Sequence, residues 1–136
     1  MFDGQKCVIV VSDSLPMGMA VNAASVIALT VGKMINGIIG PDIVDGSGFR
    51  HVGITTVPIP VLKASAAALF DIRERAMGDG LFVVDFSDAA QQTRNYTDYT
   101  TLLGERQADQ LTYLALGLVG AKKFVSKLTG SLALVR

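Results

Sequence analysis

Short apolar runs alternate with longer segments of helical periodicity along this chain. Val8–Val11 and Leu81–Val84 are apolar at every position and rich in β-branched residues, which is typical of central strands covered on both faces. The periodicity of Leu111–Leu118 fits a helix or a strand, and its short length and nearby glycines favour a strand. Val57–Leu62 carries two prolines two residues apart, so it is predicted to be an edge strand.

Three segments have the spacing of amphipathic helices. Pro16–Asn36 places apolar residues every three or four positions after a polar turn, and glycines follow it. Ala64–Met77 begins with alanine and leucine and ends at a glycine, and Ala121–Leu128 ends before Thr129-Gly130. These segments predict one long and two short helices.

The remaining segments are turns and loops. Residues 42–56 combine two apolar pairs with a turn at Asp45-Gly-Ser-Gly48 and predict a hairpin-like excursion. Residues 87–110 are polar and predict a long loop with a helical turn, of the kind that is often functional. The last six residues, SLALVR, form an extended tail.

The order of these elements predicts the fold class. A strand, a helix, a hairpin, a strand, a helix, a strand, a loop, a strand and a helix follow one another. Such alternation is characteristic of a three-layer α/β/α domain with a mixed sheet of four to five strands. At 136 residues, the chain is expected to form a single domain, residues 1–136.

The amino-acid composition indicates the cellular compartment in which the protein is expected. Half of the residues are hydrophobic, yet the longest apolar segment, Met17–Ile39, is interrupted by glycine and polar residues, so no membrane span is predicted. The first residues, MFDGQK, lack the apolar core of a secretion signal, and the single cysteine, Cys7, suits a reducing compartment. A cytoplasmic protein is therefore expected.

Charge and hydrophobicity also bear on binding partners. Twelve basic and twelve acidic residues give a formal net charge of zero, which disfavours nucleic-acid binding. The apolar content exceeds what a domain of this size can bury, which favours a homodimer formed through the long apolar helix.

Several kinds of chemistry find no support in the sequence. One histidine, His51, and one cysteine, Cys7, lie far apart, and no pair of carboxylates has the spacing of metal ligands. The phosphate-binding and nucleophile motifs G-x-x-x-x-G-K-[ST], G-x-G-x-x-G and G-x-S-x-G are absent from the first strand–helix junction. No metal and no cofactor are predicted.

The first candidate site is the junction between the first strand and the long helix. A helix N-terminus with free N–H groups favours an anion or a carbonyl oxygen. Small and polar side chains gather there, at positions that share one helical face or the preceding turn. We predict that they bind a ligand: Ser14, Gly18, Asn22 and Ser25, with Asp13 as a candidate base. A helix cap followed by a close-packed helix crossing is the alternative role for these residues.

The second candidate site follows the strand Leu81–Val84. Asp85, Ser87, Asp88 and Thr93 come directly after it. If this strand and the first are parallel neighbours, both carboxyl ends open into the same crevice. Asp88 and Thr93, together with Asp13, are the predicted catalytic residues. A loop carboxylate or a helix cap is the alternative role for Asp88.

Part of this pattern resembles type II peptidyl-tRNA hydrolase. That family has an apolar strand followed by a pattern close to D-L-x-M-G-x-G-K-x-A-A-Q. Near the end it has T-x-L-x-x-G and then K-[VL]-T-G, similar to Thr112–Gly117 and Lys127–Gly130. The resemblance covers most of the chain and implies the fold of that family. In the first motif the matching residues are Leu15, Met17, Gly18, Ala23 and Ala24.

The chain differs from that family at positions where the family has its catalytic lysine and a glutamine. Val21 occupies the place of the catalytic lysine, and Ser25 that of the glutamine four residues later. A valine can neither hold a phosphate nor polarise an ester carbonyl, so peptidyl-tRNA hydrolysis by the family's mechanism is not expected. The chain resembles a group of small prokaryotic proteins of unassigned function that share this fold with an altered centre.

Three functional hypotheses follow. In the first, the crevice at the first strand–helix junction binds a small ligand or a partner without hydrolysing peptidyl-tRNA. In the second, the protein is a hydrolase or transferase with a reorganised site, in which Asp88 or Asp13 acts as base. In the third, it is a dimeric interaction module.

Overall fold

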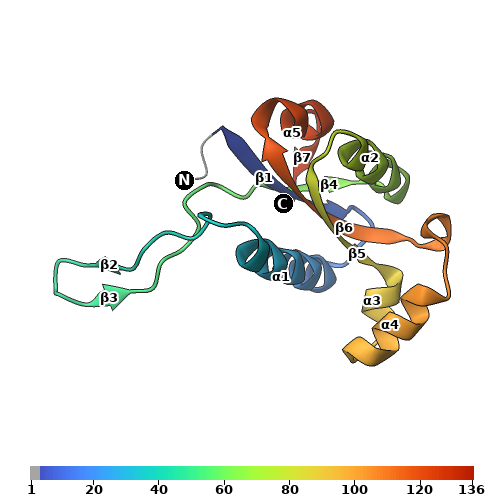
Figure 1. Ribbon diagram of the computed structural model, residues 1–136, viewed down its shortest axis with the longest axis horizontal. Helices are drawn as coiled ribbons and strands as arrows, with labels where there is room; N and C mark the ends of the chain where they lie inside the picture. The colour runs from blue at the N-terminus through green and yellow to red at the C-terminus, as the bar shows by residue number, and fades with distance from the viewer. Residues whose placement is uncertain (1–3) are drawn as a thin grey trace.

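A five-stranded mixed sheet forms the centre of the computed structural model, which describes residues 4–136 (Figure 1). The strand order is β5-β6-β1-β4-β7. β1 runs parallel to β4 and antiparallel to β6, and β5 and β7 pair antiparallel at the two edges. The strands are β1 (Gln5–Ser12), β4 (Val61–Ala64), β5 (Phe82–Ser87), β6 (Tyr113–Ala121) and β7 (Ala133–Leu134).

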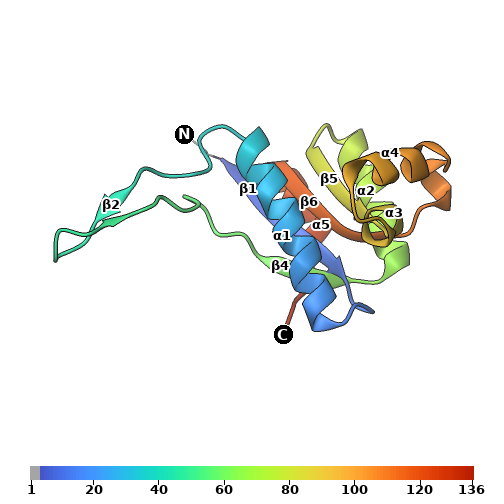
Figure 2. The ribbon, with the colours of Figure 1, turned by 90° about the horizontal axis from the view of Figure 1, so that it is seen from below.

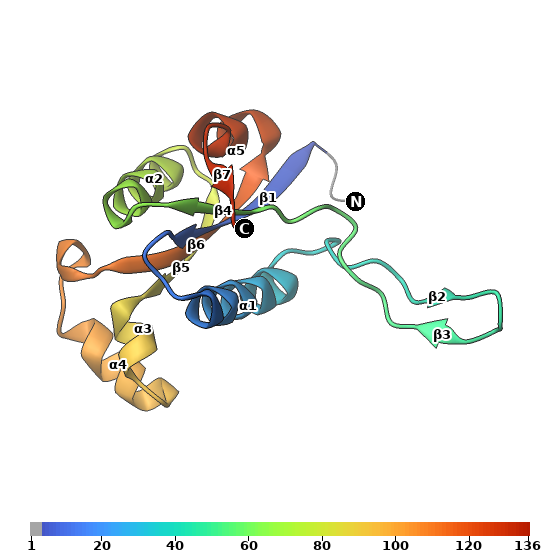
Figure 3. The same ribbon diagram turned by 180° about the vertical axis from the view of Figure 1, so that it is seen from behind.

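Helices cover both faces of this sheet (Figures 1 and 3). On one face lie α1 (Met17–Met34), α3 (Asp88–Gln92) and α4 (Tyr96–Gly104). On the other lie α2 (Ala66–Gly78) and α5 (Lys122–Thr129), and a 3-10 turn at Ala108–Gln110 leads into β6. The predicted α/β fold class with a mixed sheet is therefore confirmed.

Two hydrophobic cores, one on each face, hold the layers together. β1 contributes to both, because its side chains alternate between the faces and all six residues from Cys7 to Ser12 are buried. Ala20, Ala23, Ile27 and Val31 form the buried stripe of α1. This helix approaches the sheet closely because Gly117 of β6 has no side chain: a Cβ there would lie 2.5 Å from Ile27 Cγ2.

The hairpin predicted at 42–56 extends away from the rest of the molecule (Figure 2). Its two short strands are β2 (Ile43–Val44) and β3 (Arg50–His51), and they pair antiparallel. All of residues 41–52 are exposed. We call residues 40–54 the arm.

Two predicted elements differ from those observed. The strand expected at Val57–Leu62 begins only at Val61, after Pro60, because proline cannot donate to a ladder. It also lies inside the sheet, since Leu134 of the tail pairs with Leu62 and makes β7 the edge. The expected long loop 87–110 contains α3, α4 and the 3-10 turn.

The length and composition of α1 would allow it to cross a membrane. Its 18 residues have a mean hydropathy of 1.3, and no other helix within residues 4–136 passes this test. The core helix of a globular protein can pass the same test, and α1 buries one stripe against the sheet. Its remaining surface is exposed and still largely apolar.

Candidate functional site

The turn between β1 and α1 is held by its own polar groups. Ser12 is buried, and its hydroxyl lies 2.9 Å from the hydroxyl of Ser14. The Asp13 N–H donates to the carbonyl of Ala64 at 2.9 Å, which ties the turn to the end of β4. The side chain of Pro16, at the N-cap, gives no capping bond to α1. The junction is thus fixed relative to the sheet.

An apolar groove of about 480 Å³ runs beside this junction, between α1 and the β4 side of the sheet. It exists because, among the described residues, α1 packs mainly over β1, β5 and β6 rather than over β4. Small side chains on α1, Ala20, Ala24 and Ala28, leave room beside Ile59 and Val61. The remaining lining residues are Ile9, Val11, Met17, Val21, Ser25 and Val135.

One end of the groove is polar. A second cavity of about 110 Å³ shares Val11, Met17, Ala20 and Val135 with the groove, so the two are contiguous. Its other lining residues include Asp13, Lys63 and Arg136. Two cationic side chains and one carboxylate therefore surround the end of an otherwise apolar channel.

The predicted ligand-binding residues divide between this groove and the solvent. Ser25 lines the groove, although its hydroxyl donates to the Val21 carbonyl at 2.8 Å. Ser14 bonds to Ser12, which lines the polar end. Gly18 and Asn22 are exposed and line neither cavity. Their predicted role in ligand binding stays a prediction.

Asp88 is engaged within the chain. One carboxylate oxygen accepts a hydrogen bond from the Arg106 guanidinium at 3.1 Å, and the other accepts one from the Thr112 N–H at 3.2 Å. Its own N–H donates to the Thr112 carbonyl at 2.9 Å. These contacts favour the helix-start role over that of a free base, because both oxygens already have partners.

The two candidate sites do not share one crevice. β1 and β5 point the same way, but β6 lies between them, with Ala115 paired to both Val11 and Phe86. Two strand spacings separate their ends by about 10 Å. Thr93 instead lines a separate cavity of about 470 Å³ on the other side of α1, with Asp85, Arg94 and Tyr99.

Several polar residues near these sites were not singled out in the sequence. Arg73 donates to Asp85 at 3.0 Å and lies 4.7 Å from the centre of the Tyr113 ring. Burial, together with the charge of Asp85, raises the pKa of Tyr99. Lys63 could have been found, because it is the only charged residue in the apolar run VPIPVLKA.

The described residues also limit the chemistry. Within residues 4–136, no group of three or more His, Cys, Asp and Glu side chains could hold a metal ion. The Ser87 hydroxyl, beside the second candidate site, is buried and has no hydrogen-bond partner among these residues. The geometry defines a three-layer α/β protein with an apolar groove and a polar end beside its first strand–helix junction.

The chain belongs to the family described as protein of unknown function (DUF2000), whose model matches residues 5–136. A solved structure of a protein of unknown function from Agrobacterium tumefaciens strain C58 is similar over its whole length. Its TM-score is 0.90 with 20% sequence identity, and the match covers 100% of both chains. No curated protein matches the chain in sequence. These findings support the fold but show no relationship to type II peptidyl-tRNA hydrolase.

Proposed function

We propose that this protein binds a small amphipathic carboxylate, such as a fatty acid or an acylated metabolite. The apolar chain of the ligand lies in the groove between α1 and β4, and its carboxylate lies at the polar end near Lys63 and Arg136. The observation that carries this proposal is that an apolar groove lies next to a small cavity that two cations line, with four lining residues in common.

The size and lining of the groove support this ligand class. A volume of about 480 Å³ is within the usual range of small-molecule sites, which are mostly apolar with a few placed polar groups. Ser25 is the one polar side chain along the groove, and it already donates to its own helix. A polar ligand body would find few partners there, whereas an alkyl chain would lose only water contacts.

The polar end supports an anionic group. Two cationic side chains, Lys63 and Arg136, line this end, against the single side-chain carboxylate of Asp13. The hydrolase or transferase hypothesis lacks comparable support, because Arg106 and the Thr112 N–H occupy the two carboxylate oxygens of Asp88.

Thermal denaturation with decanoate, decanol and acetate tests the proposal, with each compound below its micelle-forming concentration. Decanoate should raise the Tm in a concentration-dependent way, decanol should raise it less, and acetate should not change it. If none of the three raises the Tm, the proposal is wrong.

Two pairs of variants locate the site. Ala28→Leu fills the groove and should weaken decanoate binding by about tenfold or more, whereas Ala67→Leu, on the exposed part of α2, should not. Lys63→Gln should weaken the binding of decanoate but not that of decanol, and Lys127→Gln should affect neither. Unchanged decanoate binding by Ala28→Leu would place the ligand elsewhere.

A further inference from the structure

The arm has a shape that its own residues specify. The Asp45 carboxylate accepts hydrogen bonds from the N–H groups of Ser47 and Phe49, at 2.8 and 3.0 Å. Its second oxygen lies 2.7 Å from His51 Nε2. Gly48 adopts a positive φ of 83° in the turn. A segment with this many internal constraints is a defined hairpin.

The base of the arm is equally constrained. The Gly40 N–H donates to the Ile54 carbonyl at 2.9 Å, and the Thr56 N–H donates to the Ile38 carbonyl at 2.7 Å. A Cβ on Gly53 would lie 1.9 Å from the Gly40 carbonyl oxygen, so the two segments at the base of the arm are in direct backbone contact. The two legs of the arm are therefore held together at its base by hydrogen bonds and close backbone packing.

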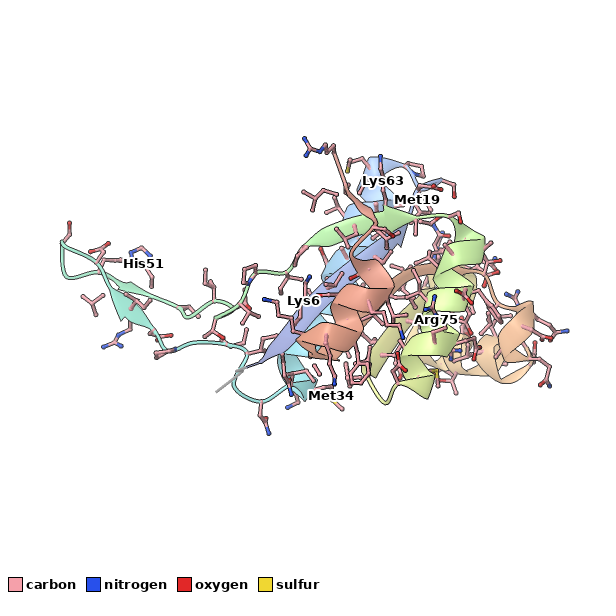
Figure 4. All side chains as sticks on the ribbon, turned by 90° about the horizontal axis from the view of Figure 1, so that it is seen from above. Lys6, Met19, Met34, His51, Lys63 and Arg75 are labelled. Carbon is pink, nitrogen blue, oxygen red and sulfur yellow. The ribbon has the colours of Figure 1, made fainter. Side chains whose placement is uncertain are left out.

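Within the described part of the chain, this arm projects away from the sheet and helices, and all of residues 41–52 are exposed (Figure 2). In Figure 4, His51 is labelled on the arm, well away from the other labelled side chains. Val52 is 81% exposed, and both faces of the hairpin carry further exposed apolar side chains, Ile43, Val44, Phe49 and Ile54. An isolated two-stranded hairpin is marginally stable in water, and packing against a helix or a further strand is needed to stabilise it.

A matching surface lies on α1. We define its outer face as the five exposed residues Gly18, Asn22, Ser25, Val26 and Leu29. Leu29 is 78% exposed, and Lys33 is the only charged residue in the whole helix. Gly18, Asn22, Ser25 and Leu29 are spaced by four, three and four residues, which is the spacing of a helix-packing seam. The small side chains at the start of this seam leave room for a second chain.

The total surface indicates how much of this area a partner could cover. A compact monomer of 14.3 kDa has an accessible surface of about 6,800 Å². This chain exposes 8242 Å², about 1,400 Å² more than that expected value. A stable interface of ordinary size buries about 800 Å² on each partner. The excess is thus sufficient for a stable dimer.

We infer that two copies of the chain associate about a two-fold axis, each laying its arm against the outer face of the partner's α1. One chain supplies both the projecting arm and the receiving helix, so a two-fold axis uses each surface twice and closes the assembly. The formal net charge of zero means that two copies do not repel each other. This inference goes beyond ligand binding, because the outer face shares only Ser25 with the lining of the groove.

Light scattering after size exclusion tests the inference with the full chain. The wild type at about 10 µM should have twice the 14.3 kDa mass of one chain. Leu29→Glu and Val52→Asp should each give a monomer with unchanged far-UV circular dichroism, because both side chains are already exposed in the monomer. Met77→Glu changes a 53% exposed residue of α2 on the opposite face and should remain a dimer.

Mixed cysteine variants test the placement of the arm. A Val52→Cys chain mixed with a Leu29→Cys chain should form a disulfide-linked heterodimer under mild oxidation. Cross-links only between identical variants would overturn the placement of the arm on α1.

Two other results would overturn the inference altogether. A wild-type monomer at 100 µM would exclude the dimer. Flotation of that monomer with phosphatidylcholine and phosphatidylglycerol vesicles would instead assign the outer face to a membrane. The Lys63→Gln variant should remain a dimer, so failure of the ligand proposal and failure of this one are distinguishable.

Discussion

The guanidinium of Arg106 lies 3.1 Å from a carboxylate oxygen of Asp88, and this pair joins the start of α3 to the segment that precedes β6. Both side chains are about three-quarters buried, so the pair is only partly screened by water. The second Asp88 oxygen accepts from the Thr112 N–H. A residue predicted to be a catalytic base thus has a structural role at the end of β5.

Asp88→Ala should lower the free energy of unfolding by about 1–3 kcal/mol, because it leaves the Arg106 and Thr112 donors without their partner. Asp88→Asn should cost less, since its carbonyl oxygen can still accept from Thr112. Urea denaturation measures both. Asp71→Ala, which removes an exposed pair with Arg75, should change stability by less than about 0.5 kcal/mol. Equal effects at Asp88 and Asp71 would contradict this role.

The arm should loosen at acidic pH. The hydrogen bond from His51, followed by those from the Phe49 and Ser47 N–H groups, lowers the pKa of Asp45. A carboxyl group with a lowered folded-state pKa stabilises the folded arm above its ordinary pKa of about 3.9 and loses this effect as pH falls through the lower value. NMR should show the Phe49–His51 ring contact weakening below about pH 4.

Asp45→Asn is the matched control for this titration. The amide oxygen can still accept from the backbone, but it does not titrate. The ring contact of this variant should therefore not change between pH 5 and pH 2, and a wild type that behaves in the same way would refute the role of Asp45.

Cys7 should be almost unreactive in the folded protein. Burial raises the pKa of its thiol from 9.0 to about 11, which lowers the thiolate fraction at pH 8 about 100-fold. Modification by a thiol reagent at pH 8 should be at least that much slower in buffer than in 6 M guanidinium chloride. Because the thiol of Cys7 has a higher pKa in the folded than in the unfolded protein, the free energy of unfolding should fall as pH rises from about 9 through about 11. A native rate within tenfold of the denatured rate would disprove the burial argument.

Two glycines on facing elements should respond in opposite directions to alanine. Gly117→Ala should cost about 1–3 kcal/mol, because its Cβ would meet Ile27 and Val84. Gly32→Ala should stabilise α1 by about 0.5–1 kcal/mol, since beyond its chain neighbours and the backbone of its own helix no atom lies within 4 Å of the new methyl group. Urea denaturation of the two variants measures the difference. Similar changes in both would refute the close approach of α1 to the sheet at Gly117.

The sequence predicted the elements whose pattern is local. Val8–Val11 is buried on both faces as its continuous apolar run requires, and the long helix predicted at Pro16–Asn36 is observed at Met17–Met34. α4 was missed because threonine and tyrosine are weak helix formers. The sequence did contain a helix-start signal, because the Asn95 side chain caps α4 by accepting a hydrogen bond from the Asp98 N–H.

The sequence could not predict which strands become neighbours. The expected common crevice required β1 and β5 to be adjacent, and nothing near either strand shows that β6 pairs with both. The groove likewise depends on how far α1 covers the sheet, which is a tertiary property. The sequence marks Lys63 as a lone charge in an apolar run, but its place at the polar end of the groove follows from the pairing of β4 with β1.

The backbone contacts at the base of the arm make it separable from the domain that carries it. Because Gly40 and Ile54 are hydrogen-bonded to each other, a short turn could join the chain there and leave every strand of the sheet in place. Evolution could therefore lengthen, shorten or delete the arm by one insertion or deletion without redesigning the core. Related chains that differ in this segment should fold alike and differ in their state of assembly.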